Sequence, residues 1–157
     1  MLQTTAQDSV ARIERLADII MVLQRCFIQR LSEQLSHGRV SFAQYFLLTH
    51  VSAGGSLTMS AIAEKMNHST AAATGLVDRL ENLGYLRRAA VTGDRRKVLV
   101  QITKKGVRLV EKIREDIIGN LDEFMHELTP DEQEAWLRIY EKMYSYCTAK
   151  PKVPLNS

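Results

Sequence analysis

The sequence has few of the features that mark secreted or membrane-spanning proteins. Only two of its 157 residues are cysteine, and Cys26 and Cys147 lie near opposite ends of the chain. A disulfide-stapled domain would carry more cysteines, so reduced thiols in a cytoplasm are expected. No apolar run approaches the roughly 20 residues that cross a bilayer. The first ten residues, MLQTTAQDSV, also lack the basic and then apolar order of a signal peptide. We therefore expect no membrane partner.

Motifs of enzymes and metal sites are missing as well. The sequence has no nucleophile-elbow motif, no phosphate-binding loop and no acid–base pair at helical spacing. Its four histidines show no metal-ligand spacing among themselves or with the cysteines. Apolar residues make up 45% of the chain and charged residues 25%, which is typical of a globular domain. We expect a single domain over residues 1–157 with no catalytic residues, metal or cofactor.

The charges that are present are segregated along the chain. Between Arg87 and Arg108 there are eight basic residues and one acid, whereas nine acids and two bases follow between Glu111 and Glu134. A solvated surface usually mixes both signs, so this separation indicates that the basic segment meets a polyanion.

Long amphipathic helices are predicted at both ends of the chain. Apolar residues recur every three or four positions over 8–36 and again over 104–148, where Thr129, Pro130 and Glu132 start a second helix. These helices carry more apolar surface than the roughly 50 residues between them can cover. The pattern therefore favours a second copy of the chain as a partner, forming a homodimer.

The middle of the chain, residues 40–103, predicts a helix-turn-helix. Ser41 and Gln44 have capping-box spacing at the start of one helix. Two short helices follow, with Thr58 and Ser69 as their N-caps. Asn67, between them, suits a left-handed C-cap, because asparagine tolerates that conformation.

The hydrophobic period changes from 3.6 to 2 after Gly84. In KVLVQIT, Val98, Val100 and Ile102 alternate with Leu99, Gln101 and Thr103. YLRRAAV is the expected antiparallel partner, and TGDRR the turn between them. Residues 85–103 therefore predict a β-hairpin wing with a basic tip. The predicted fold is mainly α with a small β wing: a winged helix-turn-helix flanked by long dimerisation helices.

This arrangement indicates binding to double-stranded DNA. The second helix of such a pair enters the major groove, so its outer face should carry small or hydrogen-bonding residues. The helix that starts after Ser69 offers such a face, opposite its apolar side. The predicted contacts there are Ser69, Thr70, Ala71, Ala72, Thr74, Gly75 and Arg79.

The wing supplies the second set of predicted DNA contacts. Arg95 and Arg96 at its tip suit a minor groove, whose negative potential attracts arginine, and Asp94 is placed to orient one of them. The stems carry three further cations suited to phosphates: Arg87, Arg88 and Lys97.

Residues 57–106 resemble the DNA-binding core of the MarR family, the multiple-antibiotic-resistance regulators. The resemblance rests on LVDRLE, GYLRR, GDRRKVLVQIT and KKG, in that order and spacing. It implies a triangular homodimer held by the first, fifth and sixth helices, with two winged lobes that read a pseudo-palindromic site. It also implies a repressor released by a small ligand, often an aromatic anion. The sequence departs from the family where it has Ala72, Ala73 and Gly75, since the family often carries polar, basic or β-branched residues there.

The resemblance also suggests where regulation would act. Five residues on the first two helices could line the family's ligand cleft, although the aromatic ones could equally be core: Phe27, Arg30, Tyr45, Phe46 and His50. Cys26 is a redox candidate, because a hydroperoxide-sensing branch has a cysteine followed by phenylalanine in its first helix. A small buried residue is the simpler interpretation of Cys26. A winged-helix module that binds an acidic protein surface is the alternative to a DNA reader.

Overall fold

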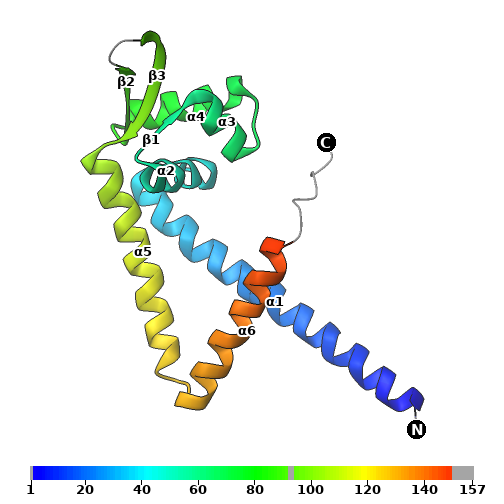
Figure 1. Cartoon of the computed structure of the whole chain (residues 1–157). Helices are drawn as coiled ribbons and strands as arrows, with labels where there is room; N and C mark the ends of the chain where they lie inside the picture. Colours follow the sequence, from blue (N-terminus) through cyan, green and yellow to red (C-terminus); the bar gives the residue numbers. More distant parts are fainter. Residues whose placement is uncertain (1, 92–93, 150–157) are drawn as a thin grey trace. The chain divides into compact units, whose positions relative to one another are not determined.

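The computed structural model describes the backbone of residues 2–91 and 94–149, and the side chains of residues 8–90 and 98–149. Within these ranges the protein is mainly helical with one small sheet (Figure 1), and the predicted fold class is confirmed. The elements are α1 (Leu2–Gly38), α2 (Phe42–Gly54), β1 (Ser56–Thr58), α3 (Met59–Met66), α4 (Thr70–Asn82), β2 (Leu86–Val91), β3 (Asp94–Ile102), α5 (Lys104–Met125) and α6 (Pro130–Ala149).

The chain forms two compact units. The first, residues 1–113, holds the sheet and α1 to α4, together with the first turns of α5. The second, residues 114–157, holds the rest of α5 and α6. That residues 1–157 act as a single domain stays a prediction.

Helix α1 is longer than the sequence pattern indicated. It spans residues 2–38 instead of 8–36, because no proline or glycine interrupts the chain before its apolar stripe begins. Its end is a Schellman motif in which Val40 N–H donates to the Leu35 carbonyl and Arg39 N–H to that of Ser36. Arg39 takes the left-handed conformation, with φ of 57°. Gly38, which precedes it, packs closely against α5, since a Cβ at Gly38 would lie 3.0 Å from the Leu109 side chain.

The predicted helix caps are confirmed. Ser41 and Gln44 exchange the two hydrogen bonds of a capping box at the start of α2. Asn67 closes α3 in the left-handed conformation, with φ of 52° and ψ of 46°. At α6, the Thr129 backbone N–H and hydroxyl both donate to Glu132, which holds the pKa of that carboxyl below its ordinary value. These starts and stops depend on local hydrogen bonds, which is why the sequence could predict them.

The sheet contains a strand that the sequence pattern did not indicate. The three residues of β1 pair antiparallel with β3, so that the strand order is β1-β3-β2. The expected hairpin of β2 and β3 is confirmed, with Arg88 opposite Val100 and Leu86 opposite Ile102. Thr92 and Gly93, at the expected turn, lie outside the described residues.

The core lies where α2, α3 and α4 meet the inner face of the sheet. Its fully buried side chains come from all of these elements: Leu47, Leu48, Val51, Ile62, Ala73, Val77, Leu80 and Val100. The core therefore holds α4 against the base of the hairpin.

The base of the hairpin packs closely against the start of α5. Thr103 N–H donates to the Tyr85 carbonyl, and the Tyr85 hydroxyl donates to the Gly38 carbonyl at the end of α1. Gly106, in the first turn of α5, lies so close to this junction that an added Cβ would be 2.4 Å from the Tyr85 carbonyl oxygen. The same Cβ would lie 2.7 Å from Ile102. Only glycine fits there.

Gly106→Ala is expected to lower the free energy of unfolding by about 1–3 kcal/mol, because the new methyl must displace backbone. Urea unfolding followed by circular dichroism measures the change. Gly75→Ala is the matched control, since no described atom beyond its own helix backbone and chain neighbours lies within 4 Å of its Cβ position. The control should raise stability by up to about 1 kcal/mol through helix propensity. An equal effect of both substitutions would contradict the close packing at Gly106.

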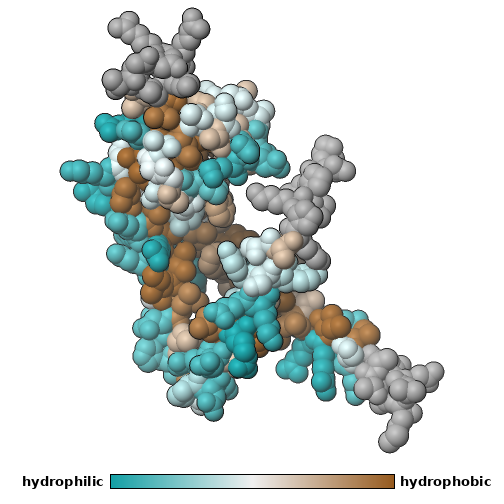
Figure 2. Space-filling model, in the orientation of Figure 1, coloured by the Kyte–Doolittle hydropathy of each residue, from teal (hydrophilic) through white to brown (hydrophobic). Residues whose placement is uncertain are grey.

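The long helices expose much of their apolar surface in the single chain. On α1, Ile13, Leu16 and Leu23 are more than half exposed, and on α6 so is Leu137. Figure 2 shows hydrophobic residues at the surface along α1 and α5. None of the described helices is long and apolar enough to cross a membrane.

Candidate nucleic-acid interface

Helix α4 presents its first turn to solvent. The Ser69 side chain accepts a hydrogen bond from Ala72 N–H at 3.3 Å, which is the predicted N-cap. Ser69, Thr70 and Ala71 are all exposed. The N–H groups of a first helical turn have no carbonyl partner within the helix and favour negative groups, so this end of α4 suits a phosphate.

The predicted outer face of α4 is also exposed. Ala72, Gly75 and Arg79 reach solvent, while Ala73 is fully buried in the core. Thr74 is half-buried, and its hydroxyl donates to the Thr70 carbonyl at 2.8 Å. The face is therefore low in relief, with few side-chain donors beyond Thr70 and Arg79.

Gly75 is not required by packing within the described part of the chain. Beyond its own helix backbone and chain neighbours, no described atom lies within 4 Å of the position that its Cβ would occupy. A glycine in a helix costs about 1 kcal/mol relative to alanine. Packing inside the described part of the chain therefore does not explain this glycine, and its contact with DNA stays a prediction.

The two arginines of β2 lie on opposite faces of the hairpin, because successive strand residues alternate. Arg87 is exposed and pairs in register with Gln101. Arg88 pairs with the buried Val100, and its side chain extends to α4. These two predicted stem cations, Arg87 and Arg88, therefore differ in their surroundings: Arg87 faces solvent and Arg88 faces α4.

Arg88 binds two carboxylates of α4. Its guanidinium forms ion pairs with Glu81 and, at 2.6 Å, with Asp78, while its backbone N–H donates to Glu81 at 2.9 Å. Partial burial opposes the charged form, but hydrogen bonds and attraction from Asp78 and Glu81 outweigh it and raise the pKa of Arg88. Glu81 was not among the predicted residues. The spacing of Asp78 and Glu81, three apart on one helix face, is the signal that could have indicated it.

The DNA contacts of the wing tip stay a prediction. The backbone of residues 94–97 begins β3, but the side chains of Asp94, Arg95, Arg96 and Lys97 lie outside the described residues.

The five predicted ligand residues differ widely in exposure. Phe27 and Arg30 are exposed on α1, and Phe46 is exposed on α2. Tyr45 is buried, which raises the pKa of its phenol, and His50 is half-buried. Of these, the structure brings Tyr45 and Phe46 together, with ring centroids 6.0 Å apart. The ligand role of the five residues stays a prediction.

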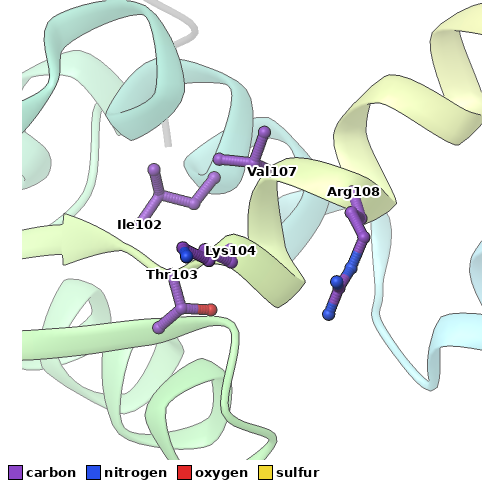
Figure 3. A pocket seen from close by; sticks show the side chains of 5 residues that line it. All are labelled: Ile102, Thr103, Lys104, Val107 and Arg108. Atoms are coloured by element: carbon purple, nitrogen blue, oxygen red, sulfur yellow. The ribbon is translucent and has the colours of Figure 1, made fainter.

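A surface hollow lies elsewhere, at the start of α5. Its volume is about 380 Å³, and it is lined by Ile102, Thr103, Lys104, Val107 and Arg108 (Figure 3). The Thr103 hydroxyl is engaged, since it donates to the Gly84 carbonyl and accepts from Gly106 N–H. None of the five predicted ligand residues lines this hollow.

Cys26 is exposed on α1, as is Cys147 on α6, so neither is a buried core residue of the single chain. Among the described residues no group of three or more histidine, cysteine, aspartate or glutamate side chains could hold a metal ion.

The sequence is similar to those of known transcriptional regulators. The sequence model of the MarR family matches residues 40–97. The helix-turn-helix-type transcriptional regulator MhqR of Bacillus subtilis is 31% identical over 102 residues, which cover 65% of this chain and 68% of MhqR. The regulator YfiV of the same organism is 35% identical over 102 residues, and the match covers 65% of this chain and 62% of YfiV. This chain thus spans less than two thirds of the length of YfiV.

A solved structure of a MarR family protein from Bacillus stearothermophilus has the same fold. Its TM-score is 0.74 at 25% identity, and the match covers 90% of this chain and 97% of the other.

Proposed function

Because the chain belongs to the MarR family of helix-turn-helix transcriptional regulators, we propose that it binds a specific pseudo-palindromic site in double-stranded DNA as a homodimer and acts as a repressor. The observation that carries this proposal is the outer face of α4. Its capped first turn and its small exposed side chains allow the helix to approach base edges closely.

The wing would add contacts beside those of α4. Arg87 is exposed on the outer face of the hairpin and suits a phosphate. Arg95 and Arg96, at the far end of the hairpin from the α4 junction in sequence, suit a minor groove. Together these contacts would read shape and charge, while α4 would read base edges.

The homodimer is supported by the apolar side chains that the single chain leaves exposed. They recur along α1 and include Ile13, Leu16, Ile20, Leu23 and Phe27. A single soluble chain seldom exposes so large a continuous apolar stripe, and a second copy would cover it. A two-fold dimer would place two α4 helices about one turn of DNA apart, roughly 34 Å.

Release by a small ligand is the expected form of control, in the cytoplasm where the DNA lies. A small aromatic anion fits the family resemblance. Arg30 on α1 and the Tyr45–Phe46 pair on α2 are the residues that would meet it.

Selection of duplexes from a random DNA pool, at about 0.15 M salt, tests the proposal. We expect enrichment of an inverted repeat with half-sites about 10 bp apart, because two α4 helices would lie on one face of the duplex. Sequencing of the bound pool gives the result. Binding that enriches no sequence and only falls with salt would mean a nonspecific electrostatic surface, and would favour a protein partner for the wing.

A further inference from the structure

The hairpin of β2 and β3 is attached to α4 at its base. Tyr85 N–H donates to the Leu80 carbonyl near the end of α4, and Thr103 N–H to the Tyr85 carbonyl. The other edge of the hairpin is held by β1, which pairs with β3 at Leu99, Val100 and Gln101. A second point of attachment between β2 and α4, beyond the base of the hairpin, would fix the angle between that strand and the helix.

Arg88 provides such a second point. It lies three residues beyond Tyr85, on the inner face of the hairpin, and contacts α4 through three hydrogen bonds. One comes from its backbone and two from its guanidinium, a rigid planar fork that can serve two carboxylates at once. The partners are side chains of the helix that the proposed function places in the major groove.

The same contacts reduce the electrostatic repulsion between Asp78 and Glu81. Asp78 and Glu81 are like charges three residues apart on α4, and the side chain of Asp78 is 53% exposed. Left alone, they would repel each other and the phosphates of an approaching duplex. Arg88 neutralises part of this charge, and its guanidinium is engaged by them instead of reaching outward.

We propose that Arg88, Asp78 and Glu81 form a clamp that sets the angle between the wing and α4, and that Arg88 is a positioning residue and not a phosphate contact. This inference rests on the proposed DNA-binding function. The clamp would fix the spacing at which one lobe engages a major groove and the neighbouring minor groove together, and so narrow the range of DNA shapes that the protein accepts.

The test compares Arg88→Gln, Arg88→Lys, Glu81→Gln and the Arg88→Gln/Glu81→Gln double variant with the parent. Affinity for the selected operator is measured against salt concentration. Arg87→Gln is the matched control, since it removes the same charge from the opposite face of the same strand. Each variant is first checked for a cooperative unfolding transition.

A clamp predicts that Arg88→Gln and Glu81→Gln each weaken operator binding by about tenfold with the parental salt slope. The double variant should be little worse than either single one, because both remove the same contact. Arg88→Lys should fail to restore affinity, because an ammonium lacks the planar fork. Arg87→Gln should lower the salt slope by about one.

A phosphate contact predicts the reverse and would overturn the proposal. Arg88→Lys would then bind as the parent does, Arg88→Gln would lose about one unit of salt slope, and Glu81→Gln would bind DNA more tightly.

Hydrogen exchange without DNA separates failure of the clamp from failure of the proposed function. Glu81→Gln should speed exchange at the amides of β2 and β3, relative to the base of the hairpin, whether or not the protein reads an operator. Unchanged exchange would show that the hairpin needs no second attachment and would overturn the clamp. An absent operator with faster exchange would overturn the proposed function alone.

Discussion

Replacing Leu23 on α1 by glutamate is expected to give a folded monomer that binds the operator about 100-fold or more weakly. Leu23 is 57% exposed in the single chain, so the substitution leaves the core intact. In a homodimer each copy would bury an unpaired carboxylate against an apolar face, which is strongly unfavourable. A monomer then reads one half-site and loses the extra affinity that a dimer gains by binding two linked half-sites.

Sedimentation velocity and operator titration measure the two effects together. Val22→Glu is the matched control, because Val22 is 56% exposed but lies off the apolar stripe of α1. We expect this control to remain dimeric. If Leu23→Glu also stays dimeric, the stripe on α1 is not the dimer interface.

Removal of the wing-tip arginines is expected to have the second large effect. Arg95→Ala and Arg96→Ala should each weaken operator binding by about tenfold or more, and the double variant by more again. Both residues lie beside the turn of the hairpin, where arginine suits the negative potential of a minor groove. Neither should alter the dimer, because the wing is remote in sequence from the apolar stripe of α1.

Titration at several salt concentrations checks this expectation. Lys104→Ala is the control, since it removes one exposed positive charge of the same basic segment outside the wing. An equal loss of operator affinity for Lys104→Ala would mean that the wing contributes only general electrostatic attraction. Intact affinity in the double variant at moderate salt would show that the wing assignment is wrong.

Much of the fold followed from short-range signals. Ser41, Asn67 and Ser69 act as caps where their types predict, because a cap is satisfied by N–H and C=O groups within a few residues. The hairpin followed from the change of hydrophobic period after Gly84. The exposed face of α4 followed from the helical period in the same way.

Other features depend on residues far apart in the chain. β1 has three residues, too few for a pattern, and exists because Leu57 pairs with Val100. Gly106 is required because the Tyr85 carbonyl approaches it across the junction with the hairpin. Tyr45 and Phe46 are both candidate ligand residues, yet Phe46 is 51% exposed and Tyr45 is buried.

By itself the sequence determined the order of helices, the winged helix-turn-helix, the basic hairpin and the surplus of apolar surface on α1. All of these depend on local periodicity, capping and charge, which act within a few residues. Tertiary structure alone decided that Arg88 faces Asp78 and Glu81 while Arg87 faces solvent. The physical reason is that a strand's alternation separates two neighbours but does not say which of them faces the core. Only the packing of β2 and β3 against α4 makes that choice.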